Sequence, residues 1–185
     1  AAVVTSSETI ASNNNNTTLP TSAAVKSYAD SAIAATQQFL HVRDQKASGT
    51  DAGTFTAGAY VTRTLNNTQT NTITGASLAG NKITLPAGTY RIIASAPGYR
   101  VYRHKAILYN VTGAATLKIG TAESATPGAN VVTRSFVTGQ FTLGVTSEIE
   151  IRHRCEQSFA NQGLGWAGGF GDNEVYTDVM IWKVS

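Results

Sequence analysis

The hydrophobic pattern is clearest near residue 150, where charged and uncharged side chains alternate strictly. One side of residues 148–156 carries only charged groups, namely Glu148, Glu150, Arg152, Arg154 and Glu156. The other side carries Ile149, Ile151, His153 and Cys155. Successive side chains of a strand point to opposite faces, so this pattern predicts a β-strand with one charged and one buried face. His153 and the single cysteine, Cys155, are therefore predicted to be a core histidine and a buried, inert thiol.

The closing segment, residues 174–184, is apolar or aromatic on both faces over much of its length. A strand of this kind belongs in the middle of a sheet rather than at its edge. One face can fill the core. The other needs a partner, because a large exposed apolar patch is unusual on a soluble monomer. The residues predicted to contact identical chains in a closed cyclic assembly are Val179, Met180, Ile181 and Trp182.

Period-two patterns recur from His41 onward and predict about ten strands. The predicted strands are 41–45, 59–65, 82–85, 90–95, 102–111, 115–121, 132–138, 140–143, 148–156 and 174–184. Segments such as Leu85-Pro86-Ala87-Gly88 and Ala96-Pro97-Gly98 predict turns between them. Short strands with regular turns and no intervening helices predict an all-β fold, an antiparallel jelly-roll sandwich.

The N-terminal part of the chain has a different composition. Residues 1–19 are polar and repetitive and cannot bury enough apolar area to fold alone, so a linker or the end of a shaft is predicted. Pro20, followed by the capping candidates Thr21 and Ser22, predicts a helix start, and the helix is expected to end near residue 38. Because the sequence begins Ala-Ala-Val-Val, we expect it to be a fragment of a longer protein.

Small and apolar residues recur in this predicted helix with heptad spacing, over about two heptads. The seam consists of Val25, Ala29, Ala32, Thr36 and Phe39. A lone helix of this length is marginal in water, so it either lies on the domain as an amphipathic helix or packs against identical chains. We favour a short coiled coil, because the polar segment before it has no core of its own. The predicted organisation is a linker at 1–19, an oligomerising helix at 20–40 and a head domain at 41–185.

Charged residues make up only 14% of the 185 residues, and the formal net charge is +3. This small excess, without a basic run that contains aromatic residues, predicts no nucleic-acid partner. No apolar run is long enough to span a membrane, so no membrane insertion is expected. One cysteine provides neither an intrachain disulfide nor a zinc site.

Several segments resemble known families. Ile83–Tyr90 and the closing strand resemble the trimeric jelly rolls of the C1q and tumour-necrosis-factor (TNF) type, and residues 41–184 resemble more closely the C-terminal head of bacteriophage tail fibres. The matching segments are Ser95–Tyr99, His104–Val111, Thr133–Phe136, Gln140–Leu143, Ile151–Cys155 and Glu174–Tyr176, and Leu19–Tyr28 is similar to the linker module before such heads. The resemblance implies a C1q/TNF-like homotrimer, trimerised in part by the helix at 20–40. It also implies a place at the distal end of a virion's tail fibre, where the head acts outside the host cell on a bacterial surface glycan or protein.

The loop at residues 157–173 is the most attractive recognition element, because long loops in compact β domains tend to be functional. Aromatic faces beside amides and carboxylates suit sugar rings, which present C–H faces and hydroxyls. The candidate receptor-binding residues in the loop are Phe159, Asn161, Gln162, Trp166, Phe170, Asp172 and Asn173. Alternatively, the aromatic residues close one end of a trimer. The run of glycines predicts a backbone that side-chain packing holds poorly.

Residues 163–168 of this loop match the nucleotide-binding pattern G-x-G-x-x-G. No helix can follow through Gly169-Phe170-Gly171 and no βαβ unit surrounds the pattern, so a nucleotide site is rejected and no cofactor is expected. A metal site at Asp172, Asn173 and Glu174 is also disfavoured, because calcium needs more oxygen ligands than these residues supply.

A basic group at Arg100, Arg103, His104 and Lys105 has two interpretations. It is either a solvated face or a contact for phosphate or acidic sugars of a bacterial envelope, with Arg100 and Arg103 as the binding candidates. No Ser-His-Asp spacing or carboxylate pair stands out, so we expect no catalytic residues and no enzyme activity.

Three functional hypotheses remain from the sequence. The first is a viral attachment module, a homotrimeric fibre head that binds a bacterial surface receptor. The second is a secreted C1q/TNF-like recognition trimer, and the third is a structural cap that trimerises and aligns a fibre.

Overall fold

The computed structural model describes the backbone of residues 2–4, 18–36 and 38–184, and the side chains of residues 21–31 and 38–184. The chain divides into two compact units, Ala1–Gln38 and Phe39–Ser185. The second unit, called the head below, contains most of the chain.

The first unit contains a short pair of strands and a helix. β1 (Ala2–Val4) pairs in parallel with β2 (Thr18–Pro20), and α1 spans Ser22–Thr36. The Oγ1 of Thr21 accepts a hydrogen bond from the N–H of Ala24 at 3.1 Å, which makes Thr21 the N-cap. The predicted helix and its predicted cap are therefore present.

The predicted heptad seam is only partly available in α1. Val25 and Ala29 are exposed in the single chain, and the side chains of Ala32 and Thr36 lie outside the described residues. Phe39 is not a helical residue, so its assignment to the seam is wrong. It begins β3 (Phe39–Lys46), because its backbone pairs with Trp182 and its N–H donates to the Oγ1 of Thr72.

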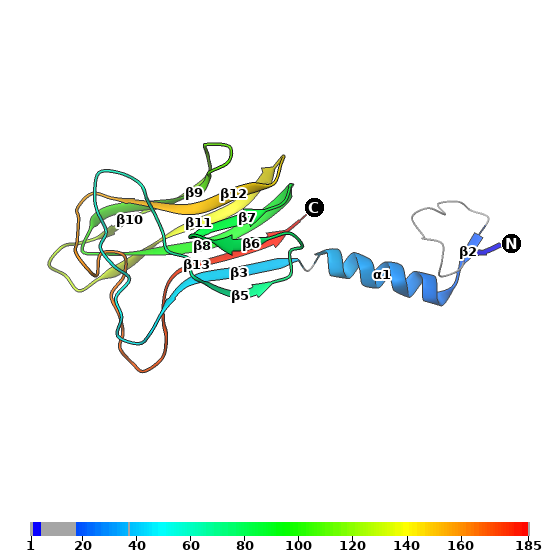
Figure 1. The fold of residues 1–185 in the computed structure, drawn as a ribbon, viewed down its shortest axis with the longest axis horizontal. Helices are drawn as coiled ribbons and strands as arrows, with labels where there is room; N and C mark the ends of the chain where they lie inside the picture. Colours follow the sequence, from blue (N-terminus) through cyan, green and yellow to red (C-terminus); the bar gives the residue numbers. More distant parts are fainter. Residues whose placement is uncertain (1, 5–17, 37, 185) are drawn as a thin grey trace. The chain divides into compact units, whose positions relative to one another are not determined.

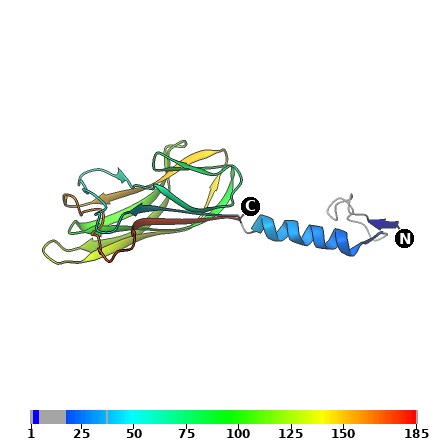
Figure 2. The same ribbon diagram turned by 60° about the horizontal axis from the view of Figure 1, so that its bottom comes forward.

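The head is a sandwich of two sheets (Figures 1 and 2). The first, called the β13 sheet, has the strand order β11-β8-β13-β3-β5, and the second, called the β9 sheet, has the order β10-β9-β12-β7-β6, with β4 paired to β12. The remaining strands are β4 (Val61–Thr62), β5 (Asn67–Asn71), β6 (Ser77–Ala79), β7 (Lys82–Leu85), β8 (Gly88–Tyr99), β9 (Tyr102–Asn110), β10 (Ala115–Ala125), β11 (Val132–Leu143), β12 (Ser147–Cys155) and β13 (Glu174–Lys183).

The core lies between the two sheets. Its buried side chains come from alternate positions of both sheets, as the period-two pattern predicts, and include Leu40, Val42, Ile92, Ala94, Leu108, Ile149, Ile151, Val179 and Ile181. β13 lies in the middle of its sheet, between β8 and β3, so the predicted central position of the closing strand is confirmed. All pairings within the head are antiparallel, and the predicted antiparallel jelly-roll sandwich is confirmed.

The predicted turn at Ala96-Pro97-Gly98 is wrong, because all three residues belong to β8 and pair with β11. Pro97 is tolerated within the strand for a local reason. Its carbonyl points away from β11 and accepts a hydrogen bond from Arg63. On this side of β8 the neighbouring strand is β13, and the pairing of β13 with β8 stops at Ser95. The missing N–H of the proline therefore removes no ladder hydrogen bond.

Other strands also differ from the sequence prediction. Residues 132–143 form one strand instead of two, because Gly139 keeps its register with Ile92 on β8. The short strands β5 and β6 were not predicted. β5 is a polar edge strand, Asn67-Thr68-Gln69-Thr70-Asn71, and such strands lack the alternating apolar pattern of a buried strand.

Strand register places four connections at one end of the head. Glu174 pairs with Lys46, and Val132 pairs with Tyr99, so the segments 47–60, 100–101, 126–131 and 156–173 all emerge there. The chain enters the head at Phe39, beside Trp182, at the opposite end (Figure 1). The four connections, called the loop end below, are therefore the part of the head remote from its attachment to the preceding chain.

Candidate functional site

The loop at 157–173 is held mainly through its backbone. It pairs with the segment 51–55, through hydrogen bonds that include Gly53 N–H to Asn161 O and a reciprocal pair between Phe55 and Phe159. A second small core lies beneath it, formed by Phe55, Val101, Ala125 and Cys155 with Phe159 and Leu164 packed against them. Main-chain hydrogen bonds thus hold the loop, in addition to the side-chain packing of Phe159 and Leu164.

Glu174 closes the loop at its C-terminal side. Its carboxylate accepts hydrogen bonds from the N–H groups of Gly49, Gly168 and Gly169 at 2.8–3.1 Å. These donors lower the pKa of the Glu174 carboxyl. The carboxylate therefore has a structural role, and among the described residues no group of three His, Cys, Asp or Glu side chains is arranged to hold a metal ion.

The glycines of the G-x-G-x-x-G pattern have packing roles. A Cβ at Gly163 would lie 2.5 Å from the carbonyl oxygen of Phe159, and a Cβ at Gly165 would lie 2.3 Å from the Tyr176 ring. Gly165 also has a φ of +147°. Only glycine permits both close approaches, and the segment forms a folded loop in place of the strand-to-helix turn of a nucleotide site.

An aromatic cluster with one arginine lies at the loop end and brings together residues predicted from separate segments. The ring of Tyr99, which is buried, contacts Phe159 edge-on at 5.5 Å and Trp166 at 5.1 Å between centroids. The guanidinium of Arg100 lies 5.4 Å from the Tyr99 ring and 5.7 Å from the Phe159 ring. Trp166 remains 43% exposed, so part of the residue faces solvent. The name aromatic end cluster is used below for Tyr99, Arg100, Phe159 and Trp166.

The other loop candidates lie outside this cluster. Phe170 is 91% exposed, and Asp172 and Asn173 are also exposed. Asn161 is exposed with a positive φ of 60°, and its N–H donates to Thr54 Oγ1. Gln162 is half-buried, and its carbonyl accepts the N–H of Gly165. These residues add amides, a carboxylate and an aromatic ring to the same loop.

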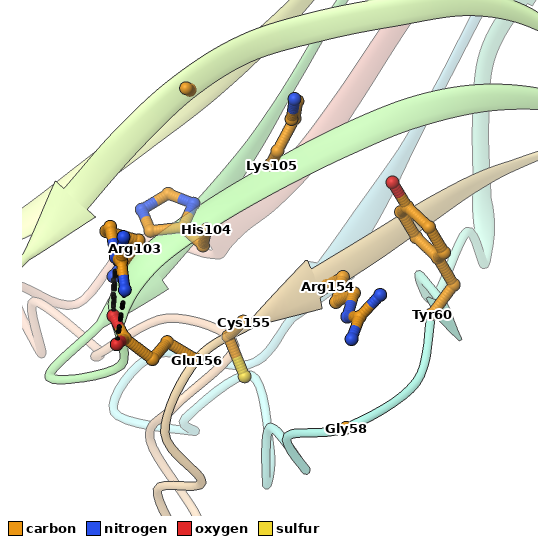
Figure 3. Close-up of a pocket in the computed structure, with 9 residues that line it drawn as sticks. Gly58, Tyr60, Arg103, His104, Lys105, Arg154, Cys155 and Glu156 are labelled. Carbon is orange, nitrogen blue, oxygen red and sulfur yellow. Dashed lines mark hydrogen bonds and ion pairs between the residues drawn. The ribbon is translucent and has the colours of Figure 1, made fainter.

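Arg103 belongs to a different surface, on the β9 sheet. It forms two hydrogen bonds with the Glu156 carboxylate, at 2.7 and 2.9 Å, at the edge of an open hollow of about 580 Å³ (Figure 3). This basic hollow is lined by Gly58, Tyr60, Arg103, His104, Lys105, Ala122, Arg154, Cys155 and Glu156. The sequence analysis grouped Arg100 with Arg103. Arg100 does not line the hollow, whereas Tyr60 and Arg154 line it together with Arg103.

A buried arginine, Arg63, supports the loop end and was not singled out from the sequence. It donates to Thr177 Oγ1 at 2.8 Å, Pro97 O at 3.2 Å and Leu164 O at 2.7 Å. Complete burial lowers its pKa to about 9. The sequence contained a signal for its burial. Arg63 and Leu65 are two positions apart in the predicted strand at 59–65, so both point to the same, inward face.

The outer face of the β13 sheet carries an apolar stripe. Trp182 packs on Phe39 with 5.0 Å between ring centroids, and Met180 pairs with Ile93 on β8. Ile93 and Phe136 are 41% and 47% exposed. Val179 and Ile181 were predicted to contact other chains, but both are fully buried in the core of the single chain, because they point to the inner face of the sheet. Met180 and Trp182 are the apolar residues of β13 that face outward, beside Asp178 on the same face.

The remaining sequence expectations concern buried groups and membranes. Cys155 and His153 are buried as predicted, and burial raises the pKa of the Cys155 thiol to about 11. None of the helices in the described part of the chain is long and apolar enough to cross a membrane.

Comparison with known proteins identifies the fold. No family model and no curated protein matches the chain. Among solved structures, Eiger TNF from S. frugiperda matches with 11% identity and a TM-score of 0.50, over 80% of this chain and 92% of that one. Murine APRIL (15% identity, TM-score 0.49) and the globular domain of zebrafish complement 1qA (12%, 0.47) each match over 80% of this chain and 98% of their own. The head thus has a jelly-roll fold like that of Eiger TNF, and at this identity the likeness concerns the fold alone.

Proposed function

We propose that this chain is the C-terminal head of a bacteriophage tail fibre, a homotrimer that attaches to a glycan on a bacterial surface through its loop end. The observation that carries the proposal is the half-exposed Trp166, held on Tyr99 beside Arg100 at the loop end. The resemblance of residues 41–184 to tail-fibre heads supplies the biological setting. In that setting the head is part of the virion and acts outside the host cell.

The trimer is supported by the apolar stripe of the β13 sheet. Phe39, Ile93, Phe136, Met180 and Trp182 share the outer face. A contiguous apolar surface on a soluble protein marks an interaction site. A second and third copy of the same chain suit it, because a closed cyclic assembly covers this face on every subunit. The half-exposed Val25 and the exposed Ala29 on α1 provide the proposed coiled-coil contacts.

The loop end has the chemistry that a neutral or weakly charged sugar requires. An exposed indole face packs against the C–H face of a sugar ring, and the amides of Asn161, Gln162 and Asn173 bond its hydroxyls. The backbone hydrogen bonds to residues 51–55 hold the loop before ligand arrives, which lowers the ordering entropy of binding. We propose a binding role without catalysis.

A glycan array with the purified head tests the proposal. We expect specific binding to one class of bacterial surface glycan, lost on Trp166→Ala. The matched control is Trp182→Ala, which removes the other tryptophan. Trp182 lies at the end of β13 that is away from the loop end, so its loss should weaken assembly while leaving the loop end intact. The absence of binding to any glycan or bacterial surface would favour a structural trimerisation cap.

A further inference from the structure

We propose that the basic hollow on the β9 sheet is a second ligand site, which binds an acidic saccharide through its carboxylate or phosphate group. The inference rests on the proposed glycan-binding role of the head. It adds that the part of the ligand bound at this site carries a negative charge. The residues that bind the anion are Lys105 and Arg154, and Tyr60 forms a wall of the hollow (Figure 3).

The register of three strands makes the two cationic residues neighbours on adjacent strands. Arg154 on β12 is the direct cross-strand partner of Lys105 on β9, and Lys105 in turn pairs with Ala122 on β10. Like charges directly opposite each other on neighbouring strands repel and destabilise the sheet. Within the described part of the chain, neither Lys105 nor Arg154 takes part in an ion pair. An anion bound between them would remove this repulsion.

Neighbouring cations on the same sheet show the opposite arrangement. Arg103 is paired with Glu156, and Arg152 is paired with Glu150 and lies 3.5 Å from the centroid of the Tyr109 ring. The β9 sheet therefore neutralises or stacks the arginines on both sides of the Lys105–Arg154 pair. The Lys105–Arg154 pair, by contrast, lines the hollow, where a ligand could reach it.

The shape of the hollow suits a sugar that carries the anion. Tyr60 is 41% exposed and offers a ring face, and the small residues Gly58 and Ala122 keep the hollow open. A volume of about 580 Å³ is within the usual range of small-ligand pockets. His104 and Cys155 also line the hollow but are buried, and burial lowers the pKa of His104 to about 4, so the charge comes from the lysine and arginines.

Titration calorimetry of the purified head with three probes tests the inference. The probes are an oligogalacturonate, which carries carboxylates, an oligomer of glycerol phosphate, and a neutral oligogalactose. The test variant is Lys105→Gln/Arg154→Gln. The control is Lys82→Gln/Lys118→Gln, which removes the same charge from the β9 sheet at positions that do not line the hollow.

We expect at least one anionic probe to bind and the neutral probe not to bind, and the better anionic probe identifies carboxylate or phosphate as the recognised group. Lys105→Gln/Arg154→Gln should weaken binding about tenfold or more, since two charge-assisted hydrogen bonds are lost, and the control should change it by less than about twofold. Without ligand, the test variant should melt at the same or a higher temperature than the wild type, because a repulsive pair is removed.

Three results would overturn the inference: no binding of either anionic probe, equal binding by the test variant, or an equal loss in the control. Failure of the proposed function is recognised separately. Trp166→Ala changes the loop end and leaves the hollow intact. If the head attaches to no bacterial surface but still binds an anionic probe, the second site is retained and the attachment role is rejected.

Discussion

The Nδ1 of His104 lies 2.9 Å from the Nε2 of His153, and both imidazoles are buried between the two sheets of the head. The Nε2 of His104 also lies 2.8 Å from Thr133 Oγ1, so His104 links β9, β11 and β12. Burial lowers the pKa of His104 to about 4, with a further contribution from Arg63 and an opposing one from Glu123. Burial, Arg63 and His104 lower the pKa of His153 as well. The pair is therefore held in its neutral form, with one imidazole donating to the other.

This pair predicts that the head loses stability in weak acid. The folded-state pKa of His104 lies below its ordinary value of 6.5, so the unfolded state binds more protons between those values and stability falls as pH drops from 6.5 toward 4. Melting temperatures measured from about pH 7.5 to about pH 4.5 should show this decline. Glu156, whose pKa Arg103 lowers to about 2, loses its contribution only at lower pH.

The matched variant for the pH measurement is His104→Gln/His153→Gln. Its melting temperature should depend less on pH over the same interval, whatever its absolute stability. A wild-type melting temperature that stays constant across the interval, or a slope that the variant leaves unchanged, would reject the buried neutral pair as its origin.

Arg63→Ala should destabilise the head strongly. The substitution leaves Thr177 Oγ1 and the carbonyls of Pro97 and Leu164 without their donors and opens a cavity under the loop end. Each buried acceptor that loses its donor typically costs about 1–3 kcal/mol in the free energy of unfolding. Urea denaturation at fixed protein concentration measures it. Arg43→Ala, which removes a partly exposed arginine bonded to Gln45, should cost less than about 1 kcal/mol, and equal effects would contradict the role given to Arg63.

Gly165→Ala should disturb the loop that carries Trp166. The new Cβ would lie 2.3 Å from the Tyr176 ring, at a φ of +147°. Overpacking of this kind destabilises by about 1–3 kcal/mol, and we expect receptor binding to fall with it. Gly144→Ala is the control, because nothing lies within 4 Å of its added Cβ. Thermal denaturation of both variants checks the prediction, which fails if they melt together.

Ile93→Asp should dissociate the trimer and leave the fold of each chain intact. Ile93 lies on the outer face of the β13 sheet beside Met180, so a carboxylate there would be buried in the proposed interface but exposed in a monomer. Sedimentation velocity at micromolar concentration should detect monomers of Ile93→Asp and trimers of the wild type. Val145→Asp, at an exposed position in the turn between β11 and β12, should remain trimeric. A monomeric wild type would refute the assembly.

Alternation along the chain was sufficient to predict most of the head. The inward positions of Ile149, Ile151, His153 and Cys155 follow from a period of two, and the central place of β13 follows from apolar residues on both faces. The same rule departs from the structure at Glu150, which is buried although its neighbours on that face are not. Its carboxylate accepts hydrogen bonds from Arg152 on the same strand and from Thr62, which the pairing of β4 with β12 brings beside it.

The sites were harder to predict, because they depend on pairing between distant segments. Phe159, Trp166 and Arg100 were candidates, but no local pattern indicates that Tyr99 joins them into one cluster. The pairing of Lys105 with Arg154 depends on the register of β9 and β12, which the sequence did not fix. The turn assigned to Pro97 failed for a related reason, since composition cannot reveal that β13 stops pairing at Ser95.

Adsorption of the purified head to bacterial cells, with and without Trp166→Ala, tests receptor attachment through the loop end most directly. Trp166 is half-exposed, so its removal should leave the trimer and its melting temperature nearly unchanged. The loss of an aromatic hot spot typically weakens binding by about 2 kcal/mol, or about thirtyfold in Kd. We predict this loss of adsorption for Trp166→Ala, measured as equilibrium binding of labelled trimer to a host strain. Unchanged adsorption together with a lowered melting temperature would assign Trp166 to structure and contradict attachment through the loop end.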